Sequence, residues 1–292
     1  MSPHHRPATE KQLAALVKAR TALVKKHTCE RCGEEDPSCG LDKQSDWRIY
    51  NVQREGEIIH RYCISCRLYF RWIDSRQKIE QQLHTLFAEQ IPFYLLDTET
   101  TGKLESRTCQ IVEIAIIDQD AQVVYQSLCK PDITMPASAS EVNGLTDEVL
   151  ADAPTFTQIW PEVVKILTAN EPPLYAWNAE FDRQALLKTA TRFGLMVPEM
   201  LQWPEEVKQK SRWHCAMKMH ARWYGEWSNG KDNYRWQSLG WACSDLEIEG
   251  SNWHRAIGDA QQTLRVLQAI ADRNGGYPPP DEMPSHQYYY GE

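Results

Sequence analysis

Three short runs of β-prone residues in the middle of the chain constrain its fold more than any other feature. They cover residues 93–96, 111–117 and 123–128. Apolar runs of this length favour buried strands, and three strands with no helix between them favour an antiparallel meander. Helical patterns follow at 155–169, 181–193, 213–223 and 258–271, with a further short strand at 173–177. This mixture of strands and helices predicts an α/β domain.

The first of these strands ends in two carboxylates, Asp97 and Glu99. Side chains alternate along a strand, so residues two apart face the same way. Two carboxylates on one face repel each other unless a cation lies between them. A pair of this kind is also common on protein surfaces, so alone it leaves both interpretations open. The run Thr100, Thr101, Gly102 that follows it is much less common.

Two further motifs lie at the edges of predicted elements. Asn178 to Asp182, sequence NAEFD, follows the strand at 173–177 and opens a helix. Asp182 therefore lies near a helix N-terminus, where an anion is stabilised, although a capping aspartate would give the same pattern. His254 and Asp259 are five residues apart, and on one helix they would point about 140° away from each other. They converge only if His254 lies in the loop before the last helix and Asp259 in its first turn.

Taken in order, these motifs resemble those of the DEDDh exonucleases. Similar proteins are the proofreading epsilon subunits of bacterial DNA polymerase III, ribonuclease T and oligoribonuclease. The resemblance spans residues 91–272 and includes the flanking stretches 111–114, 130–132, 142–146 and 153–156. It implies a ribonuclease-H-like exonuclease fold, in which helices flank a mixed sheet.

The resemblance also implies an activity, metal-dependent 3′→5′ hydrolysis that releases nucleoside 5′-monophosphates, with single-stranded DNA as the expected substrate. Asp97, Glu99, Asp182 and Asp259 would hold two Mg²⁺ or Mn²⁺ ions about 4 Å apart, with Asp97 shared by both. His254 would act as the general base, because histidine ordinarily titrates close to neutral pH. An exoribonuclease that trims RNA 3′ ends is an alternative, since that choice depends on contacts to the 2′-OH. A second alternative, an idle nucleic-acid-binding adaptor, has no need of all five catalytic residues.

Residues beside the carboxylates are expected to contact the substrate. They are Thr100, Thr101, Gly102, Asn178 and Phe181. Backbone amides around Gly102 would approach the terminal nucleotide, because glycine admits close contacts. Two positions depart from the family: Trp177 and Asn143 stand where members often have histidine. Neither is a metal ligand, so these departures bear on substrate preference and not on activity.

A different module is predicted ahead of this domain. Cys29 and Cys32 form one C-x-x-C pair and Cys63 and Cys66 another, separated by 30 residues that include a β-hairpin pattern at 47–62. Two such pairs at the ends of a hairpin predict one structural Zn²⁺ bound by four thiolates, an arrangement that resembles a zinc ribbon. Four unrelated thiols or a redox pair are the alternatives. Whether this module contacts nucleic acid or a protein partner is open.

Charge and composition suggest how these parts are organised. The net charge of −8 argues against indiscriminate binding of nucleic acid. Residues 1–90 carry +3 and residues 91–292 carry −11, so the first part is the one suited to a phosphate backbone. We expect four segments: an N-terminal helix (1–28), the zinc-ribbon-like module with a linker helix (29–90), the exonuclease domain (91–272) and a disordered tail (273–292). No apolar run has the roughly 18 residues of a membrane helix and no signal peptide is apparent, which predicts a cytoplasmic protein.

Overall fold

The computed structural model describes residues 50–54, 57–62, 64–169, 172–202, 212–228, 233–250 and 254–274. The chain forms two compact units, Met1–Asp74 with Asp281–Glu292 and Ser75–Pro280. In the first unit, strands β1 (Tyr50–Arg54) and β2 (Glu57–Tyr62) pair antiparallel, which confirms the predicted hairpin.

The structure describes none of the side chains of the predicted zinc ligands. Cys29, Cys32 and Cys63 lie outside the described residues. Cys66 lies near the start of helix α2 (Ile64–Ala88), in a stretch whose side chains are not described. The zinc site and the N-terminal helix therefore stay predictions.

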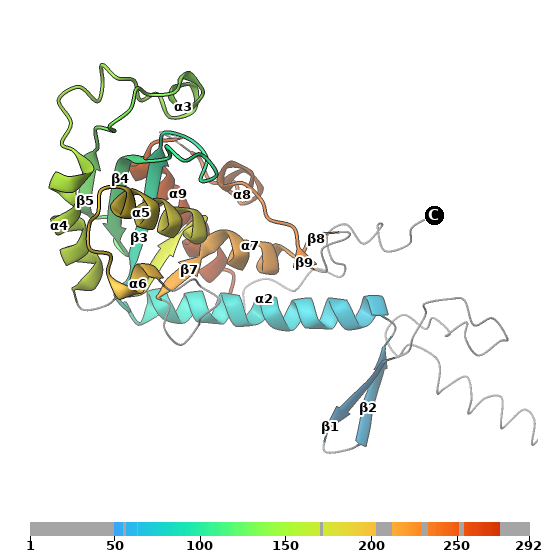
Figure 1. Ribbon diagram of the computed structural model, residues 1–292. Coiled ribbons are helices and arrows are strands. Elements are labelled where there is room, and N and C mark those ends of the chain that lie inside the picture. Colours follow the sequence, from blue (N-terminus) through green and yellow to red (C-terminus); the bar gives the residue numbers. More distant parts are fainter. Residues whose placement is uncertain are drawn as a thin grey trace, which may run out of the picture. The chain divides into compact units, whose positions relative to one another are not determined.

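A five-stranded sheet in the order β5-β4-β3-β6-β7 forms the centre of the second unit (Figure 1). The strands are β3 (Tyr94–Thr100), β4 (Ile111–Asp118), β5 (Val123–Leu128), β6 (Leu174–Ala176) and β7 (Trp213–Cys215). β3, β4 and β5 pair antiparallel, as the meander predicts. β6 and β7 run parallel to β3, so the sheet is mixed.

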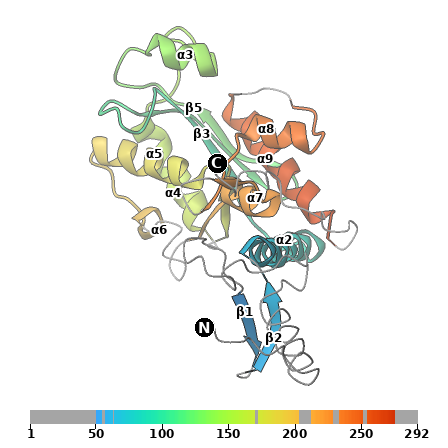
Figure 2. The same cartoon turned by 90° about the vertical axis from the view of Figure 1, so that its right-hand side faces the viewer.

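Helices cover both faces of this sheet. Figure 2 shows α4 (Phe156–Thr168) and α5 (Ala179–Arg192) on one side, and α8 (Leu239–Asp245) and α9 (Ala256–Ala271) on the other. The remaining elements are α3 (Ala137–Asn143), α6 (Glu199–Gln202), α7 (Ala216–Tyr224), β8 (Trp227–Ser228) and β9 (Asn233–Tyr234). None of the described helices combines the length and apolar character of a membrane span.

The layers explain why β4 is buried along its length. Seven of its eight residues, Ile111 to Ile117, are buried, because helices pack on both faces of a central strand. α2 joins the same core through Ile79, Leu83 and Leu86 on one helical face. A hydrogen bond also connects α2 to α7, because Trp223 Nε1 donates to the carboxylate of Glu80 at 2.8 Å.

The predicted helix at 213–223 is wrong at its beginning. Trp213 and Cys215 are buried and His214 is half-buried between them, an alternation that fits a strand. This segment pairs with β6 as β7, and the helix starts only at Ala216. Of the tryptophans in this part of the chain, Trp213 and Trp223 belong to the core, whereas Trp236 and Trp241 are exposed.

A buried histidine lies within this aromatic region. His220 of α7 is 0% exposed and packs against the rings of Trp177, Trp223, Tyr224 and Trp241, with centroids 5.7 to 6.0 Å away. Neither of its ring nitrogens has a hydrogen-bond partner among the described residues. Burial lowers the pKa of His220 to about 4.

We predict that His220 sensitises the fold to acid. An unfolded histidine titrates at about pH 6.5, so between that pH and about 4 the unfolded state binds a proton that the folded state does not. Stability is therefore lost as the pH falls through this window, by up to about 3 kcal/mol. His220→Phe, which keeps the aromatic packing, should flatten the decline in melting temperature between pH 7 and pH 4.5.

The matched control is His84→Phe, which changes an exposed histidine of α2. Its melting temperature should depend on pH as that of the wild type does. An equally steep acid decline in His220→Phe would show that His220 does not cause it.

Candidate active site

Three carboxylates from two distant segments meet at the sheet. Asp97 and Glu99 are half-buried on the same side of β3, as the strand period predicts. Asp259 lies in the first turn of α9, which packs across β3 and β4. Carboxylate oxygens of Asp97, Glu99 and Asp259 all lie within 4.8 Å of one another. They are close enough to share a cation.

The fourth predicted carboxylate, Asp182, approaches from α5. It lies in the first turn of that helix and is 3% exposed. The Thr98 hydroxyl donates to its Oδ1 at 2.8 Å, which fastens α5 to β3. Its charge acts on Asp97 more strongly than that of either other member of the cluster. The structure thus places Asp182 close to Asp97, at the start of the helix where the sequence predicts it.

Burial and nearby negative charges raise the pKa values of these four carboxyl groups above their ordinary range. Burial, followed by the charge of Asp182, raises the pKa of Asp97 well above its usual range. Burial and Asp259 raise the pKa of Glu99 to about 8, against a hydrogen bond from Asn143. Burial raises the pKa of Asp182 to about 7, against the bond from Thr98. The pKa of Asp259 is also raised by burial, which the charge of His254 opposes.

The residues present fit a divalent cation. Oδ1 of Asp259 is buried and has no hydrogen-bond partner among the described residues. Carboxylate oxygens are the ligands that Mg²⁺ and Mn²⁺ prefer. A cation there would satisfy this oxygen and offset the burial and repulsion that raise all four pKa values.

His254 lies where the sequence requires it for convergence. It precedes α9 in a turn, is exposed, and has a φ of 59°. A non-glycine residue with this φ is uncommon and strained, which indicates that its surroundings fix it there. The next residue, Arg255, is the N-cap of α9, and its carbonyl accepts the Asp259 N–H at 3.0 Å.

Glu113 holds this turn in place through hydrogen bonds to Arg255 and Ala256. The sequence motifs assign it no role. Glu113 of β4 is 0% exposed and stands opposite Glu99 in the strand register. It accepts hydrogen bonds from Nε and Nη2 of Arg255, each at 2.9 Å, and from the Ala256 N–H at 3.1 Å. The signal is present in the sequence: a charged residue inside the apolar run IVEIAIID needs a buried partner.

The predicted substrate contacts lie at the end of β3 and at the start of α5. Thr100 Oγ1 donates to the Gly102 carbonyl at 2.7 Å, and Thr101 Oγ1 to that of Thr108 at 3.0 Å, so the loop is internally braced. Gly102 has a φ of 148°, with open space where a Cβ would be. Asn178 is the exposed N-cap residue of α5, and Phe181 is half-buried in its first turn.

The two positions that depart from the family are buried. Asn143 donates to the Thr100 carbonyl at 3.4 Å and accepts from the Leu145 N–H at 3.0 Å, so it supports the same loop. Trp177 accepts the Met217 N–H at its carbonyl, 2.9 Å away. Both residues therefore brace segments that carry predicted site residues.

Comparisons with known proteins match the segment that carries these carboxylates. The exonuclease family model RNase_T matches residues 95–267. A protein of Escherichia phage 186, named Uncharacterized exonuclease CP81, is 33% identical over 178 residues, which cover 60% of this chain and 86% of that protein. The DNA polymerase III subunit epsilon of Treponema pallidum (strain Nichols) is 32% identical over 101 residues, 34% of this chain and 46% of that protein.

A solved structure supports the fold. E. coli Exonuclease I, in complex with a dT13 oligonucleotide, aligns with a TM-score of 0.51 and 18% identity over 63% of this chain and 42% of that one. The chain thus spans less than half of Exonuclease I and of the epsilon subunit. The family match covers more than half of this chain and includes Asp97, Glu99, Asp182 and Asp259, so the chain belongs to the exonuclease family.

Proposed function

We propose that this protein is a metal-dependent 3′→5′ exonuclease that releases nucleoside 5′-monophosphates, with single-stranded DNA as its preferred substrate. The observation that supports it most is the meeting of Asp97, Glu99 and Asp259 within 4.8 Å, with Asp182 beside them. Carboxylates that merely share an exposed surface keep their ordinary pKa values, whereas burial raises the pKa of all four of these groups. The single-strand preference rests on the resemblance of the motifs to proofreading nucleases.

Each residue of the cluster has a proposed task. Asp97, Glu99 and Asp259 would hold one Mg²⁺ or Mn²⁺ ion, and Asp97 and Asp182 would hold a second. Bound ions would supply Lewis-acid polarisation of the scissile phosphate and stabilise charge on the attacking and leaving oxygens. His254, exposed next to Asp259, accepts the proton of the attacking water. The terminal nucleotide lies against Gly102, where the missing Cβ leaves open space.

We predict stepwise shortening from a free 3′ end. Digestion of a 5′-labelled single-stranded DNA with Mg²⁺ or Mn²⁺ should give a ladder and 5′-mononucleotides, and a 3′-phosphate should block it. Asp97→Asn should lower the rate by roughly 10³-fold or more, because Asp97 contributes to the whole ion cluster. An RNA of the same sequence and a circular single-stranded DNA complete the panel.

Two results would contradict this assignment. Cuts in the circular DNA would identify an endonuclease. RNA degraded at least about tenfold faster than DNA would reassign the substrate to RNA 3′ ends.

We predict that Glu113 positions the catalytic turn without touching the substrate. His254→Ala, which removes the proposed base, should lower kcat by roughly 10²–10⁴-fold. Glu113→Gln should lower kcat by about 10- to 100-fold with little change in KM, the range typical of residues that orient a metal site from outside it. Steady-state kinetics on an oligothymidylate measure both.

Thermal melts separate positioning from simple loss of fold. Glu113→Gln should melt as one transition, and the double variant with His254→Ala should lose little more activity than His254→Ala alone. Independent, multiplicative losses in the double variant would refute the idea that Glu113 acts through the His254 turn.

A further inference from the structure

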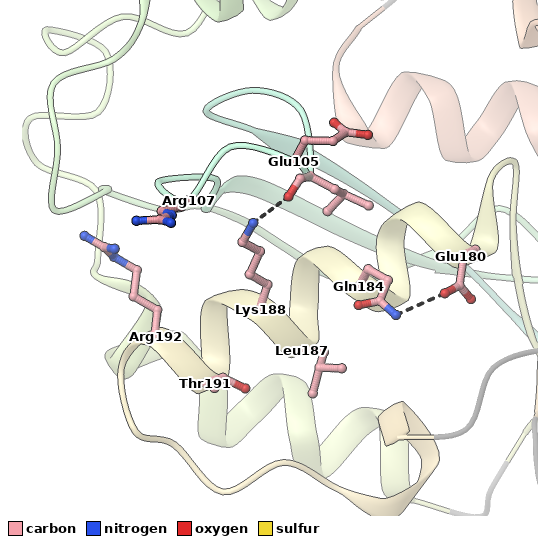
Figure 3. A pocket seen from close by; sticks show the side chains of 9 residues that line it. Glu105, Arg107, Glu180, Gln184, Leu187, Lys188, Thr191 and Arg192 are labelled. Carbon is pink, nitrogen blue, oxygen red and sulfur yellow. Dashed lines mark hydrogen bonds between the residues drawn. The ribbon is translucent and has the colours of Figure 1, made fainter.

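A cavity of about 970 Å³ lies on the outer face of α5 (Figure 3). Its walls are the loop that follows β3 and the solvent side of the helix. The side chains that matter here are Leu104, Glu105 and Arg107 from the loop and Gln184, Lys188 and Arg192 from α5. No residue of the proposed catalytic cluster lines it, so it is a separate feature of the surface.

Both walls of the cavity begin at the proposed active site. The loop starts at Gly102, directly after the strand that carries Asp97 and Glu99. Helix α5 carries Asp182 in its first turn and Arg192 at its end. Ten residues of helix span about 15 Å, so the cavity runs along a path that leads away from the carboxylates.

The two walls are fastened to each other. Lys188 Nζ donates to the carbonyls of Leu104 and Ser106, at 2.5 and 2.6 Å. An ammonium that bridges two loop carbonyls holds the loop at a set distance from α5. The cavity is therefore preformed, which reduces the ordering cost for a ligand.

Positive charge gathers at the end far from the carboxylates. Arg107 and Arg192 both line the cavity there, and Figure 3 shows the Glu105 carboxylate pointing away from them. Arg192 binds Asp132 through two nitrogens at 2.9 to 3.2 Å. Arg107 is exposed and has no hydrogen-bond or ion-pair partner in the described part of the chain. One unneutralised cation thus remains at this end.

The end nearer the carboxylates is neutralised internally. Glu180 accepts hydrogen bonds from Arg183 at 2.7 and 3.1 Å and from Gln184 at 3.0 Å. Between the two ends, Leu187 offers an apolar surface. The cavity therefore combines an apolar floor with an arginine pair at its distal end, features that suit a sugar–phosphate chain and its bases.

We propose that this groove holds the single strand upstream of the scissile bond, with Arg107 and Arg192 binding one of its phosphates. The inference rests on the proposed function, because it requires a strand whose 3′ end lies at the carboxylates. A chain with a net charge of −8 repels a polyanion overall, so the charge of Arg107, unpaired among the residues that the structure describes, has to provide the attraction, and Arg192 adds a further guanidinium donor. A single guanidinium group can donate two parallel hydrogen bonds to two oxygens of one phosphate, whereas the ammonium group of lysine acts as a point charge.

Binding measurements with oligothymidylates of twelve and three nucleotides test this groove. Asp97→Asn serves as the background, so that the probes are not cut. Arg107→Gln should weaken binding of the twelve-mer by on the order of fivefold and reduce the slope of log Kd against log salt by about 0.7, the loss of one phosphate contact. Binding of the three-mer, which is too short to reach the arginines, should change by less than about twofold.

The matched control is Arg222→Gln, which removes one exposed positive charge from α7, outside the groove. It should bind both probes as the background protein does. An unchanged twelve-mer affinity and salt slope in Arg107→Gln would overturn the proposal, and so would equal losses for both lengths, since Arg107 would then contact the terminal nucleotides. Failure of the wild type to digest any 3′ end would refute the proposed function, whereas these binding results decide the groove separately.

Discussion

Repulsion among buried carboxylates is the constraint around which the second unit is organised. Asp97, Glu99, Asp182 and Asp259 all have raised pKa values, because burial and their neighbours' charges oppose ionisation. The fold offsets this cost only in part. Asp182 and Asp259 lie in the first turns of helices, where the helix dipole stabilises an anion. A bound cation is the remaining stabilisation that such a cluster needs.

A second constraint is the attachment of α9 to the sheet, which sets where Asp259 lies. β4 contributes Glu113, whose bonds to Arg255 and Ala256 hold the start of α9 against the sheet. That attachment keeps His254 at a φ of 59°, which an unrestrained residue would leave. A buried ion pair on β4 thereby sets the position of an exposed histidine. This task explains why an acidic residue interrupts a strand that is buried over seven of its eight residues.

Much of this architecture follows from local patterns in the sequence. The meander, the hairpin at β1 and β2, and the helices that carry Asp182 and Asp259 all have periodicities that predict them. β7 is different, because its three residues lead directly into the helical pattern of α7 and become a strand through their pairing with β6. The Glu113–Arg255 pair joins residues 142 positions apart, and the cavity beside α5 depends on side-chain packing. The charge of Glu113 inside an apolar run is a local signal, but its partner and the cavity leave no local pattern, so only the folded chain reveals these two.

The most direct test of the carboxylate cluster is to count the protons released when Mn²⁺ binds. Titration calorimetry of the metal-free protein at pH 7, in two buffers of different ionisation enthalpy, gives that number. Because the pKa values of Asp97 and Glu99 are raised in the metal-free protein, binding of Mn²⁺ should release about one proton or more per chain. Asp97→Asn should bind Mn²⁺ more weakly and release fewer protons. Tight binding without proton release, or with the same release in Asp97→Asn, would contradict the account.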